Sequence, residues 1–160
     1  MNGDNLINSP SCENAGKINF YLFAREPSDP EVTVLAEVRH GPIVFGQDPP
    51  RNTKEMLDMF ERDLVAGTVS ARLKNIKNKF KSIDFKGAAC LSFSQVGEDH
   101  AAVSGGKTQV MVLTFDGVAC IHPQKPERYI RMVLSQRAPA KKIEDLSGDL
   151  KKFTDSLEFM

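Results

Sequence analysis

The stretch that decides the fold contains three apolar runs, Phe85-Lys-Gly-Ala-Ala-Cys-Leu-Ser-Phe-Ser-Gln95, Thr108-Gln-Val-Met-Val-Leu-Thr-Phe115 continuing through Asp-Gly to Val118-Ala-Cys-Ile-His-Pro123, and Arg128-Tyr-Ile-Arg-Met-Val-Leu-Ser-Gln-Arg137. Apolar runs of this length, separated by polar or Pro-bounded segments, are typical of β-strands. We therefore predict three or four strands of one antiparallel sheet between Phe85 and Arg137.

The flanking segments predict further strands and two helices. Alternating apolar residues predict strands at 18–23 and 32–39, joined as a hairpin. Asn52 and Glu55 have capping-box spacing, and apolar residues at helical spacing predict a long central helix through Phe80. Gly67 is either a weak point in this helix or a break between two consecutive helices. A seven-residue apolar repeat predicts a C-terminal helix over 143–157. The expected fold is α+β, a mainly antiparallel sheet of about five strands in the order β-β-α-β-β-β-α, with its helices against one face.

The length of 160 residues fits one domain. Residues 1–16 are rich in Asn, Ser, Gly and Pro without periodicity, which indicates a flexible leader before a single domain at 17–160.

Charge and hydropathy narrow the classes of partner and compartment. Twenty-one basic residues balance twenty-one acidic ones, which gives no indication of nucleic-acid or membrane-surface binding. No apolar run is long enough to span a bilayer, and the N-terminus does not resemble a signal peptide. We expect either an exported, periplasmic protein whose export signal has been removed or a cytoplasmic protein.

Cysteine usage bears on that choice. Cys90 and Cys120 each follow a Gly-x-Ala step on neighbouring predicted strands, so we predict a disulfide between them. Such a bridge would contribute roughly 3.5 kcal/mol by the loop-entropy estimate. The alternative is a pair of buried thiols, and Cys12 would be a free cysteine in the leader.

Two segments have features that also occur in phosphate-binding sites. Ala101-Ala-Val-Ser-Gly-Gly-Lys107-Thr108 fits a relaxed phosphate-binding loop, but a strand-like run follows it where a helix is required. It is interpreted as a flexible hairpin loop. The second half of the central helix carries basic residues over 72–81, which favours a solvated amphipathic helix over an anion-binding one.

Residues with the capacity for catalysis or metal binding do not form a recognisable set. His40, His100 and His122 lack tight metal-ligand spacing, and no Gly-x-Ser-x-Gly elbow is present, so neither a metal, a cofactor nor a catalytic residue is predicted. Loops on a rigid sheet often carry binding function. The partner-binding residues expected from this argument lie at two loop tips: Glu98, Asp99 and His100, and His122, Lys125, Glu127 and Arg128.

The turn Cys120-Ile-His122-Pro123 before a strand ending Ser135-Gln-Arg137, together with Gly87-Ala-Ala-Cys90, resembles a pattern in small proteobacterial envelope proteins, many of them lipoproteins. Some of these are similar to periplasmic immunity proteins of type VI secretion systems. The resemblance covers about residues 52–137. The segment Asn8-Ser-Pro-Ser-Cys12 lacks the pattern of a lipidation box.

The resemblance implies a non-enzymatic exported domain that binds another protein and neutralises a secreted antibacterial toxin effector. Two alternatives from other classes stay open. One is a small hydrolase or ligand-binding domain with a cleft between the sheet and the helices. The other is a structural subunit or homodimer.

Overall fold

The computed structural model describes residues 6–7, 19–24, 29, 31–43, 51–68, 72–104 and 106–159, with the backbone alone for 6–7, 19–24, Thr68 and Ser104. The predicted disulfide pair lies in this part of the chain, and Cys12 lies outside it. The elements in chain order are β1 Leu6–Ile7, β2 Asn19–Ala24, β3 Thr33–Pro42, α1 Thr53–Thr68, β4 Leu73–Phe85, β5 Ala88–Ser104, β6 Lys107–His122, β7 Lys125–Ala138, a 3-10 turn at Ala140–Lys142, and α2 Ser147–Asp155.

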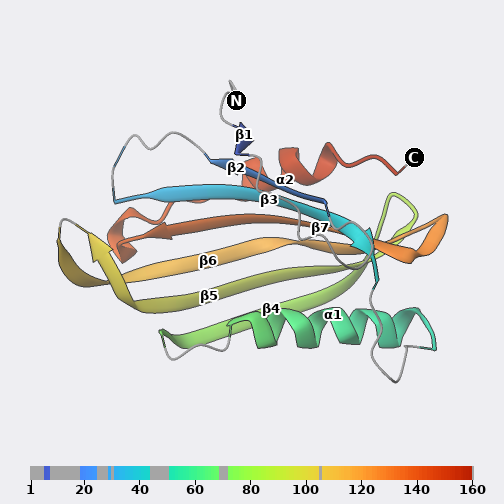
Figure 1. The fold of residues 1–160 in the computed structure, drawn as a ribbon, viewed down its shortest axis with the longest axis horizontal. Coiled ribbons are helices and arrows are strands. Elements are labelled where there is room, and N and C mark those ends of the chain that lie inside the picture. Colours follow the sequence, from blue (N-terminus) through green and yellow to red (C-terminus); the bar gives the residue numbers. More distant parts are fainter. Residues whose placement is uncertain are drawn as a thin grey trace.

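The strands form one antiparallel sheet in the spatial order β1-β2-β3-β7-β6-β5-β4 (Figure 1). The chain crosses from β3 to the far edge through α1, and β4 to β7 then return as a meander that ends beside β3. The α+β class is thus confirmed. The five long strands and two helices follow the order β-α-β-β-β-β-α, so the predicted order β-β-α-β-β-β-α is wrong. Short β2 and β1 extend the sheet beyond β3.

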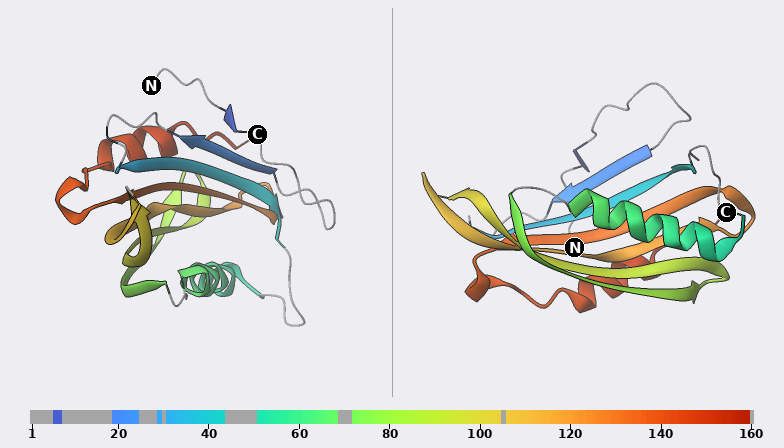
Figure 2. Two further views of the ribbon diagram at one scale, coloured as in Figure 1. Left: turned by 60° about the vertical axis from the view of Figure 1, so that its left-hand side comes forward. Right: turned by 90° about the horizontal axis from the view of Figure 1, so that it is seen from below.

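The two helices cover opposite faces of the curved sheet (Figure 2), whereas the sequence analysis placed them on one face. Residues alternate between faces along each strand. Leu91, Phe93 and their neighbours pack under α1. Cys90, Val118 and their neighbours pack under α2 and the residues that follow it. The reason for the error is that β5, β6 and β7 are apolar on both faces, so each face needs its own cover.

Helix α1 begins as predicted and ends much earlier. The backbone N–H of Glu55 donates to Asn52 Oδ1 at 3.0 Å, and Glu55 Oε2 accepts from the backbone N–H of Arg51 at 2.8 Å. The helix ends at Thr68, one residue beyond Gly67. The predicted continuation through Phe80 is wrong, because residues 73–85 form strand β4.

A β-bulge in β4 explains why that strand resembles a helix in sequence. The pairing of β4 with β5 shifts between Lys74 and Lys77, and Asn75 has a φ of 52°. Such a bulge carries Leu73 and Ile76, three residues apart, onto the same face. From Ile76 to Phe80 the strand is regular and side chains alternate between faces, so Phe80, four residues after Ile76, lies on that face too. Spacings of three and four are also those of a helix.

Two glycines in the sheet have conformational or steric roles. Lys86 and Gly87 both have positive φ in the two-residue turn between β4 and β5, as a type I′ turn requires. Gly117 lies within β6, where a Cβ atom would be 2.1 Å from the Met132 carbonyl oxygen and 2.9 Å from Phe93 Cζ. The Asp-Gly step at Gly117 is thus a point of close packing inside a continuous strand.

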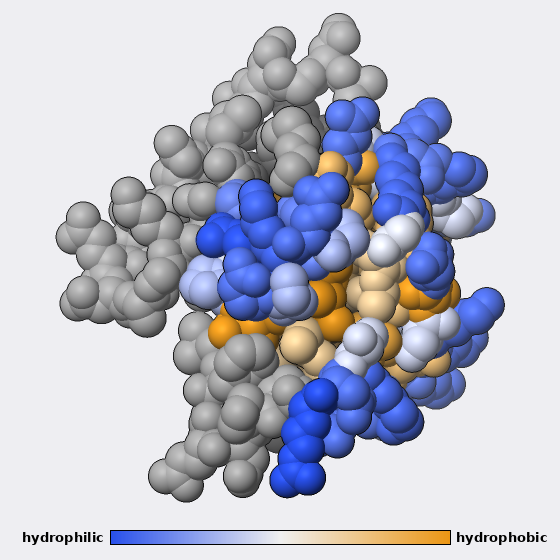
Figure 3. Space-filling view, turned by 90° about the vertical axis from the view of Figure 1, so that its right-hand side faces the viewer, coloured by the Kyte–Doolittle hydropathy of each residue, from blue (hydrophilic) through white to orange (hydrophobic). Residues whose placement is uncertain are grey.

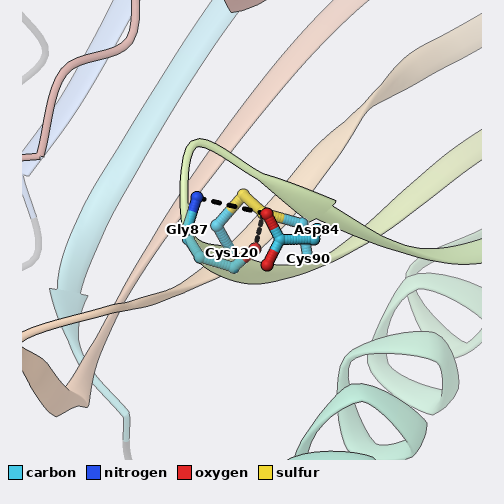
Figure 4. Close-up of a disulfide and its surroundings, with 5 residues drawn as sticks. Asp84, Gly87, Cys90 and Cys120 are labelled. Carbon is cyan, nitrogen blue, oxygen red and sulfur yellow. Dashed lines mark hydrogen bonds between the residues drawn. A yellow bond between two sulfur atoms is a disulfide. The ribbon is translucent and has the colours of Figure 1, made fainter.

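The predicted disulfide is present. Cys90 of β5 and Cys120 of β6 stand directly opposite each other, their Cα atoms are 4.0 Å apart, and both side chains are completely buried. The bridge lies close to the β4–β5 turn, where the N–H of Gly87 donates to Asp84 Oδ1 at 3.2 Å (Figure 4). It therefore fastens β5 to β6 at one end of the sheet.

Candidate protein-binding surface

The first predicted binding group, Glu98, Asp99 and His100, is not a loop tip. All three residues lie within strand β5, and Asp99 is 2% exposed. The side chains of Asp99 and its two neighbours point to opposite faces, because they are consecutive residues of a strand. The prediction that this group forms a loop is wrong, because β5 continues through all three residues.

Asp99 is the buried centre of an ion cluster whose arginines are partly exposed. Arg72 Nε and Nη2 each donate to one carboxylate oxygen of Asp99 at 2.6 Å, a two-pronged geometry that is strong and directional. Arg137 Nε lies 3.3 Å from Oδ2, and the backbone N–H of Ala101 donates to Oδ1 at 3.0 Å. The Arg72 hydrogen bonds hold the pKa of Asp99 below its usual value, against the opposing effect of burial. The cluster ties the start of β4 to β5 and β7, so its role is structural.

Glu98 and His100 lie on the α2 face, where they hydrogen-bond to each other and to β4. His100 Nε2 lies 2.9 Å from Glu98 Oε2, and Asn75 Nδ2 donates to the same oxygen at 2.9 Å. These contacts, that of His100 first, lower the pKa of Glu98. The pair supports the bulge of β4.

The second predicted group surrounds the β6–β7 turn. His122 and Lys125 are paired across this turn, while Glu127 and Arg128 lie in β7. The His122 ring packs edge-on against the Phe159 ring, with 5.5 Å between the ring centroids. On β6, Val112 pairs with Glu98, and Cys120 pairs with Cys90. His122 lies two residues beyond Cys120 and therefore ten residues beyond Val112. At about 3.4 Å per residue the two predicted groups are separated by roughly 30 Å, so they do not form one site.

The histidines are dispersed over the sheet. His40 is paired with Ile130 near the end of β3, far from His100, and burial followed by the charge of Arg128 lowers its pKa. Within the described residues no group of three or more His, Cys, Asp or Glu side chains has a geometry that could hold a metal ion.

A row of exposed lysines lies on β4, which sequence analysis assigned to a helix. Lys77, Lys79 and Lys81 alternate with residues that face α1, so all three point to the α2 face, and all are exposed. The bulge at Asn75 places Lys74 on that same face, opposite Glu98. We call Lys74, Lys77, Lys79 and Lys81 the lysine row.

The lysine row continues the line of Ile83 and Phe85 on the same strand. Those two residues pack with the α2 segment, whereas the lysines extend beyond its cover. Beside them on β5 lie half-buried Ser92 and Ser94 and, opposite Lys77, Val96 at 39% exposed. The surface thus combines cationic, hydroxyl and apolar groups.

The charge of this surface is positive. On this face of the neighbouring strands β5 and β6, the four lysines meet two carboxylates, those of Glu98 and Asp116. Glu98 is already hydrogen-bonded to Asn75 and His100. In the described part of the chain, no carboxylate lies within ion-pair distance of any lysine of the row.

The lysine row also lies at the edge of the sheet. β4 is the last strand in the spatial order, so half of its backbone N–H and C=O groups face away from β5. An extended segment of another protein can pair with such an edge. Neither described helix is long and apolar enough to cross a membrane. Comparison of the chain with family models, with curated proteins and with solved structures finds no match.

Proposed function

We propose that this chain is a protein-binding domain that recognises an acidic segment of its partner through the lysine row of β4. The observation that carries the proposal is the alignment of four exposed lysines on one face of an edge strand, with no carboxylate in ion-pair contact among the described residues. Alternate residues of an extended chain are about 6.8 Å apart, which matches the spacing of Lys77, Lys79 and Lys81.

Charge makes this edge selective. Lysines on an edge strand repel a second copy of the same strand, which counts against edge-to-edge pairing between two copies of this chain. An acidic segment reverses that sign and gains cross-strand Lys–carboxylate pairs. The proposed partner is therefore an acidic protein rather than a second copy.

The finer proposal concerns compartment and partner. The buried Cys90–Cys120 disulfide is compatible with an oxidising compartment. Together with the resemblance of the Cys-x-His-Pro turn to type VI immunity proteins, it supports a periplasmic protein that covers and neutralises a secreted antibacterial toxin. Co-expression with a candidate toxin tests this part: the chain should restore growth, and a failure to form a complex with the purified toxin would oppose it.

Charge reversal tests the binding surface. The variant Lys77→Glu/Lys79→Glu/Lys81→Glu should bind an acidic partner at least about tenfold more weakly, because three favourable pairs become repulsive. The matched control, Lys107→Glu/Lys141→Glu/Lys152→Glu, changes net charge equally at exposed positions elsewhere. Binding of a peptide of alternating Glu and Val is measured beside its Gln–Val counterpart. Equal losses in both triple variants would show a general charge effect and refute the lysine row as the site.

A further inference from the structure

The Cys90–Cys120 disulfide is covered by α2 and by the residues that follow this helix. Leu157 is 7% exposed and belongs to the same apolar cluster as the two cysteines, and Phe153 and Phe159 pack against that cluster. Its other described members belong to the strands of the sheet: Val38, Ile83, Phe85, Ala88, Val118, Ile130 and Met132. The cover over the bridge is therefore supplied by the C-terminal part of the chain.

Two contacts fix this cover at one end of the sheet. Lys86 Nζ, in the β4–β5 turn, donates to the carbonyl oxygens of Asp155 and Leu157 at 2.6 and 2.7 Å. A cation at these carbonyls also interacts favourably with the C-terminal end of α2. The Phe159 ring packs against His122, beside the β6–β7 turn. The segment thus crosses β5 and β6 at the end of the sheet that carries the bridge.

We call residues 156–159 the latch. Residues 157–159 belong to no helix or strand, and Ser156 and Glu158 are exposed. At this end of the molecule apolar side chains are recessed between charged ones (Figure 3). Strands β5 and β6, in contrast, are each paired with a neighbour on both sides. Segments with few contacts open at a lower free-energy cost than the core of a sheet, so the latch can open while the strands remain paired.

We propose that the latch controls the access of thiols to the Cys90–Cys120 disulfide, so that the bridge is reduced when the latch opens and the sheet stays folded. A thiolate must reach a sulfur atom to break a disulfide. Within the sheet, Ile83 lies opposite Cys90 and Ile130 lies opposite Cys120, so strand residues flank the bridge on both sides. The approach that a small motion opens is the one beneath Leu157. This inference does not depend on the proposed protein-binding function.

The probe is dithiothreitol, applied without denaturant to Cys12→Ser protein so that only the bridge cysteines can be labelled. One thiolate of the reagent attacks a sulfur of the bridge, the S–S bond breaks, and the displaced cysteine takes up a proton. The second thiol of the reagent then displaces the other cysteine and closes the cyclic disulfide of the reagent. Two electrons and two protons thus pass to the protein. Labelling with iodoacetamide and intact mass give the reduction rate.

Urea distinguishes latch opening from global unfolding. Opening of the latch exposes little surface, so the reduction rate should be nearly independent of urea below the unfolding transition. Access through global unfolding would instead make the rate rise steeply with urea, with the slope of the equilibrium unfolding curve. That steep rise, or an absence of reduction until the domain unfolds, would overturn the proposal.

Variants locate the site of opening. Lys86→Met removes both hydrogen bonds to the C-terminal carbonyls at similar side-chain length, and it should raise the reduction rate about tenfold. Leu157→Ala removes the buried side chain of the latch and should raise the rate about thirtyfold or more. The control is Asp99→Asn, nine residues from Cys90 along β5, which weakens the ion cluster and should leave the rate unchanged.

The comparison among these variants has a clear contrary outcome. Acceleration by Asp99→Asn as large as that by Lys86→Met would show that global stability governs access to the bridge. An unchanged rate in folded Lys86→Met would equally refute the latch. Should Leu157→Ala fold poorly, Lys86→Met and the dependence on urea still decide the question, because Lys86 is an exposed residue of a turn.

Discussion

Reduction of the Cys90–Cys120 disulfide should lower the stability of this domain by an amount that the closed loop determines. The two cysteines are 30 residues apart in sequence. The loop-entropy relation then gives about 12 cal/mol/K, or about 3.6 kcal/mol at 25 °C. For a chain of 160 residues the entropy of unfolding is about 340 cal/mol/K. The expected decrease in Tm is therefore about 11 °C.

The oxidised and reduced forms of one Cys12→Ser variant provide the comparison, because they have the same side chains and leave no cavity. Both sulfur atoms are buried, so the reduced form is prepared in denaturant and refolded with reductant present. Calorimetry gives the two Tm values, and intact mass after alkylation shows how many thiols each form contains. A difference of less than about 3 °C would refute the loop argument. Two reactive thiols in protein isolated under oxidising conditions would refute the bridge itself and with it the support for an oxidising compartment.

Two further predictions concern packing and charge. Gly117→Ala should destabilise the domain by about 3 kcal/mol or more, because the added Cβ would lie 2.1 Å from the Met132 carbonyl oxygen. Gly148→Ala is the control, because no atom lies within 4 Å of its added Cβ, and it should be neutral or slightly stabilising. Urea unfolding measures both changes. The pKa of Asp99 in the folded state is below its unfolded value of about 3.9. The stability that ionised Asp99 contributes is therefore complete above the unfolded pKa and is lost as pH falls through the folded pKa. The Tm difference between the unaltered chain and Asp99→Asn should be large near pH 7 and shrink below about pH 4, and a difference independent of pH would contradict the ion-pair explanation.

Sequence analysis succeeded where side-chain alternation or a local cap decides the structure. The capping box at Asn52, the strand around Cys120 and the pairing of the two cysteines each depend on residues close in sequence or directly opposed in the meander. The disulfide was foreseeable because both cysteines occupy corresponding positions of consecutive strands. The C-terminal helix was located, although α2 is shorter than the predicted span.

The failures share a physical cause, which is that long-range contacts override local signals. Polar residues Gly97 to His100 resemble a loop, yet the strand continues because two arginines from distant positions neutralise Asp99. Gly97 itself lies against the bulged strand, where a Cβ would be 3.4 Å from Ile76 Cγ1. The apolar spacing around Ile76 satisfies a helix and a bulged strand equally, so periodicity alone could not distinguish them.

The bulge also determines how the lysine row is arranged. If residues 74–77 alternated regularly, with no bulge at Asn75, Lys74 would point to the α1 face, and only three lysines would share the α2 face. With it, four cations are aligned on one side, where their mutual repulsion is unfavourable in the free domain. An acidic segment bound along β4 relieves that repulsion and gains the attraction as well. The same charges that oppose association between copies of this chain therefore favour an acidic partner, and binding should weaken steeply as added salt screens them.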